Sequence, residues 1–496
     1  MRTRSEQVQA HRFVTRRIAS ALLSGEPETT DLPMRRLGLA IFGSVMLATI
    51  VFAAFGIYGQ IRPGGGTLED NSIVIEQESG ARFVYLQGRL YPVLNYASAR
   101  LIMGSPAPNV STVSNRKLRD IPRGVPVGIA GAPDSLPDPG SLVGLPWQVC
   151  EGPRSTSSPT LTTSLLIGTA VPDGAGLGDE GLLLTLGDGG TAYVLLHGVR
   201  LKVTGGTAGN PVRAALNLSS ARPVVVDDAF LNALPAGPDL AVPSIPGKGG
   251  NSQKKLNGAN VAIGTLYHTN DTFYVMLAQG LATIGEVTAN LLVAGGAARP
   301  AELSPSAIGT VPITGDFDPP GMPRNLWTMH QVPNGATVCA KFTSQADPAT
   351  QTVTVDLHNQ IPGTLAQITA GDVSAPRVGV DGVVSADRVV IAGGHGALVR
   401  LLPVAGSSAG TTVYMITDQG IKYPLEATAS SGGASAAPSG QGAQSSLGYA
   451  DVKPVPIDRD LLALVPTGPV LSPAAALNFA AAATAAAPTP TVRPSS

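Results

Sequence analysis

The sequence predicts an α+β protein anchored in a membrane. We expect an N-terminal cytoplasmic helix, one transmembrane helix, and an elongated extracytoplasmic domain of four β-hairpin and short-helix repeats around a disulfide-linked central β domain. Three observations predict this fold: a long uncharged apolar stretch near the N-terminus, a tyrosine-containing hairpin pattern that recurs along the chain, and two cysteines that lie far apart.

The predicted transmembrane helix covers residues 37–58, which are uncharged and mostly apolar. At about 1.5 Å per residue this stretch reaches about 33 Å, enough for a hydrocarbon layer roughly 30 Å thick. The alternative is a cleaved signal peptide, but its apolar region usually has roughly 7–15 residues and follows a shorter arm. Arg17, Arg35 and Arg36 precede the span closely, whereas Arg62 alone follows it closely. We therefore expect a single-pass protein with its N-terminus in the cytoplasm and its large C-terminal part outside.

Small residues within the span are candidates for contacts with partner helices, because small side chains let helix backbones approach closely in lipid. These candidates are Gly43, Ser44, Ala48, Ala53, Ala54 and Gly56.

The N-terminal arm, residues 1–36, contains apolar side chains at helical spacing with arginines between them, which predicts an amphipathic helix. Such a helix can dock on a partner protein or lie on anionic lipid, and a simple positive-inside retention signal is the plainer alternative. Pro27 and Pro33 interrupt the helical pattern after it. The candidate partner-binding residues are Arg12, Phe13, Val14, Arg16, Arg17 and Ile18.

The composition limits the function classes. The net charge is −1, so the chain lacks the basic footprint of a nucleic-acid-binding protein. It has 59 glycines and 42 prolines with 4% aromatic residues, which favours many short strands and turns over long helices.

The two cysteines are Cys150 and Cys339. In an oxidising compartment one disulfide between them is the simplest pairing, with two separate buried thiols as the alternative. The bond is favoured because each cysteine follows one of the only two tryptophans, Trp147 and Trp327. A zinc site is not expected, because the two cysteines are far apart and have no histidine pair nearby to complete a ligand set.

A hairpin unit recurs in the body. Each copy has a strand with a tyrosine, a glycine turn and a second apolar run, and short helices are expected at 226–232 and 457–464, each followed by a proline-glycine stop. The copies begin at Phe83, Ala192, Phe273 and Val413.

The copies are unevenly spaced, and the gaps between them leave two segments that can form a central domain. The second and third copies lie between these two segments in the chain and so form an excursion from that domain. The predicted division is span 37–61, repeat 1 at 68–130, central domain at 131–165 and 322–398, repeat 2 at 166–250, repeat 3 at 251–321, repeat 4 at 399–471, and a disordered tail at 472–496.

Three motif matches lack the context that their chemistry requires. G-x-S-x-G at 406–410 precedes a strand-like run, where a nucleophile elbow needs a helix. G-x-G-x-x-G at 176–181 likewise precedes a strand-like run, and the glycine loop around Lys248 lacks the Walker spacing. No two of the six histidines have the spacing of a helical metal pair. We therefore predict no catalytic, cofactor-binding or metal-ligating residue.

Several of these segments together resemble the EccB family, the single-span core component of type VII (ESX) secretion systems. The resemblance covers residues from about 4 to about 470. It is carried by the arm from Arg4 to Leu22, the run Gly88-Arg89-Leu90-Tyr91-Pro92-Val93, Ala97-Ser98-Ala99-Arg100-Leu101, Ile121-Pro122-Arg123-Gly124, Trp147-Gln148-Val149-Cys150, Cys339 and Gly394-His395-Gly396-Ala397.

This resemblance implies a subunit of an inner-membrane complex that exports helical substrates, with EccC, EccD, EccE, the mycosin protease and further copies of itself as partners. It also implies four repeats around a disulfide-linked central domain. ATP hydrolysis in such a machine belongs to EccC; an ATPase activity has been attributed to EccB as well, but this sequence has no phosphate loop.

Three functions stay open at this stage: a structural subunit of a secretion machine, a membrane-anchored nucleotide hydrolase or esterase, and a module that binds the cell envelope. We favour the first, because the residues offer a scaffold and no catalytic cluster.

Overall fold

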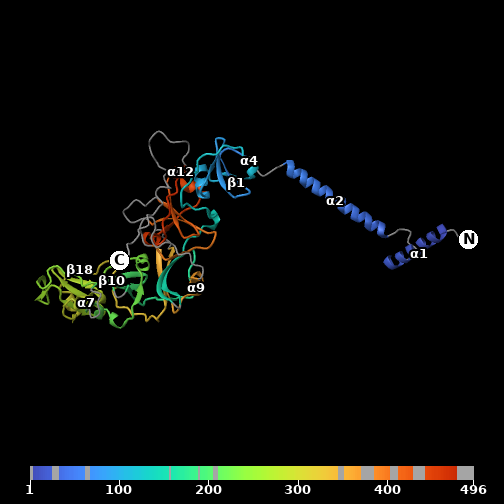
Figure 1. Cartoon of the computed structure of the whole chain (residues 1–496). Coiled ribbons are helices and arrows are strands. Elements are labelled where there is room, and N and C mark those ends of the chain that lie inside the picture. The colour runs from blue at the N-terminus through green and yellow to red at the C-terminus, as the bar shows by residue number, and fades with distance from the viewer. Residues whose placement is uncertain are drawn as a thin grey trace, which may run out of the picture.

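The computed structural model describes residues 4–24, 33–61, 68–155, 158–187, 190–204, 211–344, 351–369, 385–402, 412–427 and 442–477. Two helices, α1 (Arg4–Ser24) and α2 (Pro33–Ile61), stand apart from a large β-rich body (Figure 1). Pro33 is the first residue of α2, where its missing N–H costs nothing. Helix α2 therefore begins four residues before the predicted start of the span at Leu37.

The central domain is a six-stranded sheet in the order β21-β6-β5-β19-β20-β7. Strands β5 and β19 pair antiparallel although repeats 2 and 3 lie between them in the chain, as the predicted excursion requires. The sheet reaches past the predicted boundary at residue 165, because β6 continues beyond it and β7 pairs with β20. Its strands are β5 (Trp147–Ser155), β6 (Ser158–Ile167), β7 (Ala175–Gly176), β19 (Thr337–Ser344), β20 (Gln351–His358) and β21 (Arg388–Val390), with helices η1 (Pro139–Ser141) and α9 (Gly363–Thr369) beside them.

Four further sheets share one plan, and each contains one of the predicted hairpins. A strand precedes the hairpin, the hairpin follows, and a later strand returns in parallel beside the first strand. In repeats 1 and 2 the hairpin turns at Gln87-Gly88 and His197-Gly198, where both residues of each pair have positive φ. This is the backbone of a tight type I′ hairpin turn.

Repeat 1 contains β1 (Ser72–Glu76), β2 (Arg82–Leu86), β3 (Arg89–Pro92), α3 (Tyr96–Met103), β4 (Asn109–Val113) and α4 (Asn115–Leu118). Repeat 2 contains β8 (Leu182–Leu186), β9 (Ala192–Leu196), β10 (Val199–Val203), α5 (Pro211–Ala215), η2 (Leu218–Ser220), β11 (Val224–Val226) and α6 (Asp228–Ala233).

Repeat 3 contains β14 (Leu266–Thr269), β15 (Thr272–Leu277), β16 (Gly280–Ile284), α7 (Glu286–Ala294), β17 (Ala301–Glu302), α8 (Pro305–Ile308) and β18 (Ile313–Asp316), preceded by an unpredicted hairpin of β12 (Asn251–Leu256) and β13 (Ala259–Ala262). Repeat 4 contains β22 (Ala397–Leu401), β23 (Val413–Ile416), β24 (Lys422–Leu425), α10 (Ala443–Ser446), β25 (Val455–Ile457), α11 (Arg459–Ala463) and α12 (Pro473–Leu477).

The proline-glycine segments predicted as stops instead pair with the outer edge of each hairpin. Isolated parallel bridges join Leu90 to Arg123, Arg200 to Ala236 and Lys422 to Thr467, and each segment makes a second bridge further along. The glycine that follows each bridge lies against a hairpin side chain, Tyr423 in the case of Gly468, so that a methyl group would not fit there. The motif therefore completes the sheet.

The predicted short helices begin later than expected. Val226 and Ile457, their predicted first residues, are the last residues of the parallel strands β11 and β25, and the helices α6 and α11 follow. Three consecutive valines favour a strand over a helix in β11. The predicted disordered tail is also wrong at its start, because α12 packs on α3 and buries Ala476. The rest of the tail, and most of the serine-glycine stretch before α10, lie outside the described residues.

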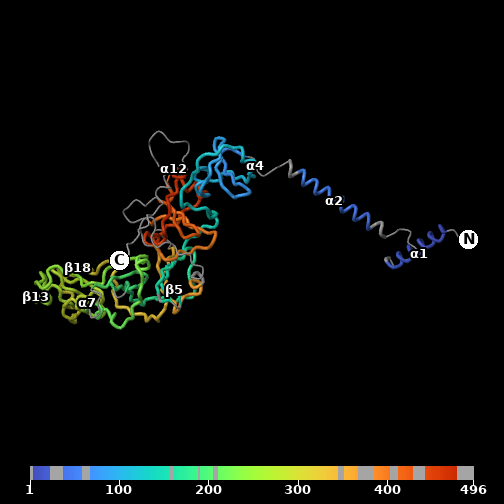
Figure 2. The backbone as a smooth tube through the Cα atoms, in the orientation of Figure 1, coloured from blue at the N-terminus to red at the C-terminus, as the bar shows by residue number. Residues whose placement is uncertain are grey.

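The body is elongated, and its buried clusters give the order of its parts (Figure 2). Repeat 3 packs on repeat 2 through Val287 and Leu291 of α7. Repeats 2 and 4 both contribute to the large core under the central sheet. Repeat 4 then shares a separate core with repeat 1. The spatial order is therefore repeat 3, repeat 2, central sheet, repeat 4, repeat 1, which places the two ends of the body's chain together.

The seam between repeats 1 and 4 begins with helix α3. Asn95 caps this helix by accepting a hydrogen bond from the Ser98 N–H, at 3.0 Å. On its far side, Arg100 donates from Nε to the carbonyl of Ser446 in repeat 4, at 3.4 Å. The Tyr449 hydroxyl donates to the Pro137 carbonyl at 2.7 Å, and burial raises the pKa of this phenol.

The fit between Gly468 and Tyr423 predicts a stability loss. A Cβ at Gly468 would lie 2.6 Å from the Tyr423 ring, which is 1% exposed and cannot move aside. We expect Gly468→Ala to lower the free energy of unfolding by about 1–3 kcal/mol in urea titration. Gly140→Ala, where no atom lies within 4 Å, is the matched control. Equal stabilities for the two variants would contradict the role given to the motif.

His358 predicts a pH dependence of stability. Burial lowers the pKa of its imidazole, while the nearby Asp356 and Asp173 carboxylates act in the opposite direction. The unfolded chain, with a pKa of about 6.5, therefore binds the proton more readily than the folded chain. The stabilisation is present above about pH 6.5 and is lost as the pH falls through the folded-state pKa. The melting temperature should fall more steeply on acidification in the wild type than in His358→Gln. Parallel curves of melting temperature against pH for the two proteins would exclude this cause.

Candidate functional site

The two cysteines form the predicted disulfide at the centre of the molecule. Cys150 on β5 and Cys339 on β19 stand directly opposite each other in the sheet and are separated by 189 positions in the chain. Both are buried, in a cluster with Leu166, Val171 and Leu365. The prediction of one disulfide is confirmed, and the alternative of two separate thiols is wrong.

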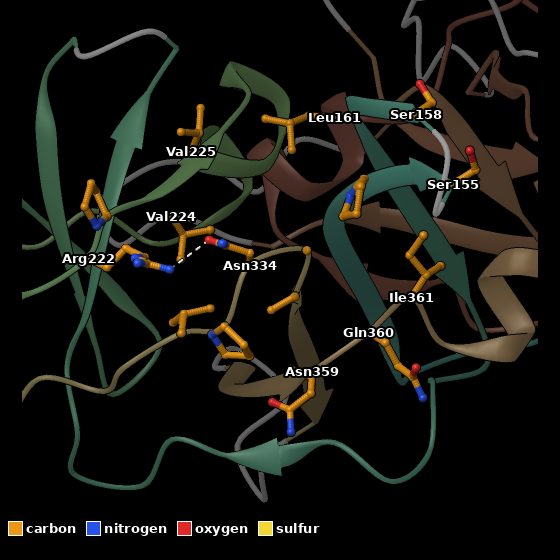
Figure 3. A pocket seen from close by; sticks show the side chains of 16 residues that line it. Ser155, Ser158, Leu161, Arg222, Val224, Val225, Asn334, Asn359, Gln360 and Ile361 are labelled. Atoms are coloured by element: carbon orange, nitrogen blue, oxygen red, sulfur yellow. Dashed lines mark hydrogen bonds between the residues drawn. The ribbon is translucent and has the colours of Figure 1, made fainter.

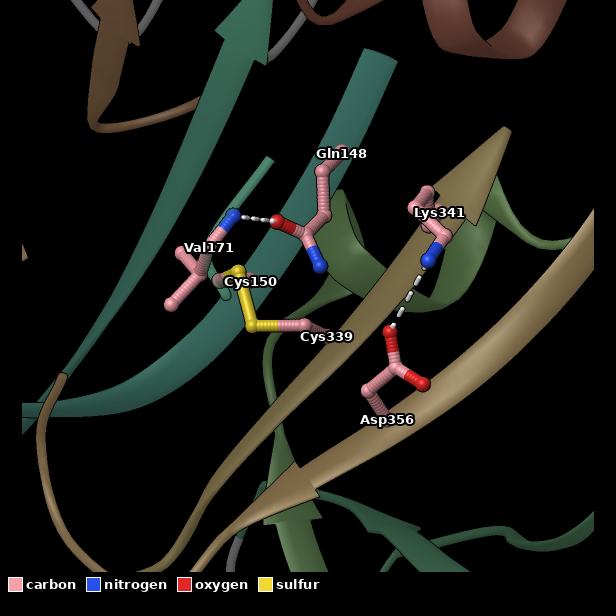
Figure 4. The surroundings of a disulfide bond; sticks show 6 residues. All are labelled: Gln148, Cys150, Val171, Cys339, Lys341 and Asp356. Carbon is pink, nitrogen blue, oxygen red and sulfur yellow. Dashed lines mark hydrogen bonds and ion pairs between the residues drawn. A yellow bond between two sulfur atoms is a disulfide. The ribbon is translucent and has the colours of Figure 1, made fainter. Parts of the chain in front are cut away.

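Polar groups surround this disulfide (Figure 4). The Gln148 side-chain oxygen accepts a hydrogen bond from the Val171 N–H at 2.6 Å, which fixes the loop after β6 against the sheet. On the other side, Lys341 Nζ lies 3.6 Å from Asp356 Oδ2. The hydrogen bond and the ion pair each join neighbouring segments, and the disulfide joins these two parts of the chain, so the site is structural in character.

The disulfide predicts a large stability effect. Replacing both cysteines by alanine removes a cross-link that closes 189 positions of chain. The loop-entropy model assigns such a cross-link roughly 5 kcal/mol of the free energy of unfolding. Urea titration of Cys150→Ala/Cys339→Ala against the wild type measures the loss, and dithiothreitol treatment of the wild type should reproduce it. A loss below about 1 kcal/mol would contradict this account.

Among the described residues, a cleft with a volume of about 810 Å³ lies between repeat 2 and the central domain (Figure 3). Arg222 reaches across it and donates to Asn334 Oδ1 at 2.8 Å. Its other polar side chains are two serines and two amides, Ser155, Ser158, Asn359 and Gln360. None of the described lining residues is a carboxylate, histidine or cysteine, so they do not include the pairs that general acid–base or nucleophilic catalysis requires.

The predicted partner-binding residues lie on α1, and all six are exposed. They do not share one face. At about 100° per residue, Phe13 is turned about 140° away from Ile18 around the helix. Val14 and Ile18 form one apolar strip, whereas Phe13 lies on the side of the arginines, with the Arg17 guanidinium 5.7 Å from its ring centre.

Helix α2 is the one helix of the described chain that is long and apolar enough to cross a membrane, over Leu37–Ile57, and its span is not buried against the body. The predicted contact residues are distributed around it rather than on one face. Ser44 and Ala48 share one side by their spacing of four, and Gly43 and Ala54 share another. Ala53 and Gly56 lie elsewhere on the helix. Their contacts with partner helices stay a prediction.

The motifs set aside at the sequence level take structural roles where they are described. His197 sits in the hairpin turn of repeat 2, with Nε2 3.0 Å from Asp179 Oδ1. Lys248 donates to the Gly295 carbonyl at 3.3 Å. Residues 406–410 lie outside the described part. No group of three or more potential metal ligands occurs in the described ranges.

Neither the seam contacts of Arg100 and Tyr449 nor the pairing of the proline-glycine segments was predicted from the sequence. The sequence did contain a signal for the pairing of the proline-glycine segments, because Tyr91, Leu201 and Tyr423 occupy matching places in three hairpins. The contacts of Arg100 and Tyr449 depend on carbonyl groups and leave no sequence pattern.

The body has four hairpin repeats, a central disulfide cross-links it, and one apolar helix is attached to it. These features define a single-span membrane scaffold protein. The family model described as "Type VII secretion system ESX-1, transport TM domain B" matches residues 1–484, and the chain belongs to this family, EccB.

Curated relatives agree with this assignment. The "ESX-5 secretion system ATPase EccB5" of Mycobacterium tuberculosis is 29% identical over 446 residues, covering 85% of each chain. The "ESX-3 secretion system ATPase EccB3" of Mycolicibacterium smegmatis is 28% identical over 483 residues, covering 94% of this chain and 88% of the relative.

Solved structures share the fold. A chain in an intact ESX-5 inner membrane complex is similar with a TM-score of 0.64 and 28% identity, over 96% of this chain and 95% of that one. A chain of the periplasmic assembly from that ESX-5 complex gives a TM-score of 0.60 at 28% identity, over 83% and 97%. An EccB3 dimer from the ESX-3 core complex gives 0.62 at 25% identity, over 82% and 100%.

Proposed function

We propose that this protein is a structural core subunit of an ESX inner membrane complex and supports protein export by assembly. The observation that carries the proposal is its likeness, over nearly the whole chain, to a subunit of an intact ESX-5 inner membrane complex. The disulfide-linked body and the uncharged span fit this role, because the disulfide restrains the shape of the body and the span anchors it in the membrane.

We place the N-terminus in the cytoplasm and the body outside the inner membrane. The basic residues before the span support this orientation by the positive-inside rule. The disulfide supports it too, since such bonds persist in oxidising compartments. A solved periplasmic assembly from the ESX-5 complex contains a similar chain.

The partners we propose are the other core subunits EccC, EccD and EccE, the mycosin protease, and a second copy of this chain. The similar EccB3 chain was solved as a dimer, which supports self-association of the exported body. The span would contact the bilayer and partner helices through Gly43, Ser44, Ala48, Ala53, Ala54 and Gly56.

Nucleotide hydrolysis is the alternative that the names of the relatives raise, since both are called ATPases. The glycine loop around Lys248 is the candidate phosphate loop, but strand β12 follows it instead of the helix that a phosphate loop needs. Lys248 itself is engaged with the Gly295 carbonyl. We therefore assign the assembly role. ATP turnover by the purified chain that disappears in Lys248→Ala would favour the alternative.

An envelope-binding module is the third alternative. Retention on peptidoglycan, together with intact secretion after deletion of the gene, would favour it over a secretion subunit.

Helix α1 offers a test of assembly. We expect Val14→Ser/Ile18→Ser to weaken co-purification of the other core subunits after mild detergent extraction, because burial of each aliphatic side chain contributes about 1.5–3 kcal/mol to binding, which is at least about tenfold in affinity. Phe13→Ala/Arg17→Ala tests the second face separately, and Ser5→Ala/Gln9→Ala is the exposed polar control. Full recovery of the complex with both test variants would refute docking through α1.

A further inference from the structure

Strand β11 of repeat 2 borders the cleft between repeat 2 and the central domain. It is the last strand in the order β10-β9-β8-β11, so among the described strands it has a neighbour on one side only. Its consecutive residues Val224 and Val225 both line the cleft (Figure 3). Consecutive side chains of a strand point to opposite faces of the sheet, so a cleft that touches both lies along the edge of the strand. The cleft therefore adjoins an open sheet edge, which we call the β11 edge.

The register of β11 shows which backbone groups face this edge. The Val226 carbonyl accepts a hydrogen bond from the Gly187 N–H at 3.4 Å, so the backbone groups of Val226 point toward β8. Successive residues of a strand direct their N–H and C=O groups to opposite sides, so those of Val225 point away from β8. Within the described chain, neither group of Val225 has a hydrogen-bond partner. An extended peptide backbone can satisfy this donor and this acceptor together.

The corresponding strand of repeat 4 is closed at the same place. Pro456 is the middle residue of β25, as Val225 is of β11, and proline has no N–H to donate. The Pro456 carbonyl accepts a hydrogen bond from Gln351 Nε2 at 3.0 Å. Proteins commonly block their sheet edges by such means. Two strands of the same plan therefore differ, and the one beside the cleft is the open one.

The cleft has one formally charged residue among its described lining residues, Arg222. This side chain donates to Asn334 Oδ1 at 2.8 Å and makes no ion pair within the described chain. A guanidinium has five N–H donors, so others remain for a carboxylate. Asp227 and Asp228 follow β11 at its other end, where α6 begins. The edge is therefore positive at its Arg222 end and negative at the opposite end.

Apolar side chains form much of the wall opposite β11. They come from the central domain, from β5 and β6 and from the segments before β19 and after β20, and they are Pro153, Leu161, Val332 and Ile361. The volume of about 810 Å³ is within the range of protein ligand sites, roughly 300–1,000 Å³. Such walls accept uncharged side chains on a bound strand, so the one charge that the cleft selects is at Arg222.

We propose that the β11 edge binds an extended peptide segment of a partner protein, which pairs with Val225 and places a carboxylate against Arg222. The antiparallel direction is favoured, because antiparallel pairs are slightly more stable than parallel pairs. It puts the acidic residue of the peptide on the C-terminal side of the residue opposite Val225. Pro223 has no N–H to add, so one residue supplies the backbone bonds and the binding is weak. This ligand site is separate from the assembly role and does not depend on it.

The test measures peptide binding to the full chain in lipid nanodiscs by fluorescence anisotropy, with empty nanodiscs as the background. The probe is a fluorescein-labelled heptapeptide of alternating threonine and valine that ends in two aspartates. A peptide with lysines in place of the aspartates should bind at least about tenfold more weakly, because it loses the charge-assisted bond to Arg222. A peptide with N-methylated central residues cannot donate to the Val225 carbonyl and should bind about threefold more weakly or worse.

Two variants locate the binding. Arg222→Glu should reverse the preference, so that the lysine peptide binds better than the aspartate peptide. Lys202→Glu makes the same charge change at an exposed position of repeat 2 outside the cleft, and should keep the original preference. Val225→Pro removes the N–H at the edge without removing a bond to β8, and should weaken the aspartate peptide about threefold. Val225→Thr keeps this N–H and should bind as the wild type does.

Three results would overturn the proposal: no binding of the aspartate peptide at about 1 mM, equal binding of the three peptides, or an unchanged preference in Arg222→Glu. The last result would place the peptide at another open edge, such as that of β4 in repeat 1. The N-methylated peptide decides the role of the edge even if Val225→Pro does not fold. None of these results bears on co-purification of the core subunits, so failure here is distinct from failure of the assembly role.

Discussion

The architecture depends on one long-range pairing, that of β5 with β19. Residues 189 positions apart, Cys150 and Cys339, face each other across this pair, and the strands around them form the middle of the six-stranded sheet. Closing so long a loop is entropically costly, and the disulfide offsets this cost by restricting the unfolded chain. Once the pair is closed, repeats 2 and 4 both pack on the face of the sheet that carries Trp147 and Phe342. Repeat 3 extends from repeat 2, and repeat 1 extends from repeat 4.

The repeats use one solution to the problem of exposed sheet edges. A hairpin alone is marginal in water, and its free edges invite pairing with other chains. In repeats 1, 2 and 4 one parallel strand covers the inner side and a short proline-glycine segment covers the outer edge. Because the glycine has no side chain, the segment can lie directly on a hairpin side chain while it pairs with the outer edge of the sheet. Repeat 3 uses strand β18 for the same purpose.

Local signals in the sequence were enough to predict the parts with local causes. The span follows from its charge-free length, and the hairpins follow from alternating apolar residues around turns such as Gln87-Gly88. The disulfide was predictable because the chain has two cysteines, which can form only one bond with each other. The parallel strands were missed because β11 and β25 are three residues long and find their partners about 40–60 residues earlier in the chain. The split of α1 into two faces was missed because the apolar residues of the arm were assigned to one helical face, although Phe13 and Ile18 are turned about 140° from each other around the helix.

The joint core of repeats 1 and 4 has a consequence for biosynthesis. Ala97 and Leu101, near the start of the body, pack with Leu471 and Ala476, near its end. A nascent chain therefore presents repeat 1 long before its packing partner has been synthesised. The end of the body that follows α2 is completed last, after almost all of the polypeptide has been made, so truncated chains expose an unfinished apolar surface there and become natural targets for quality control.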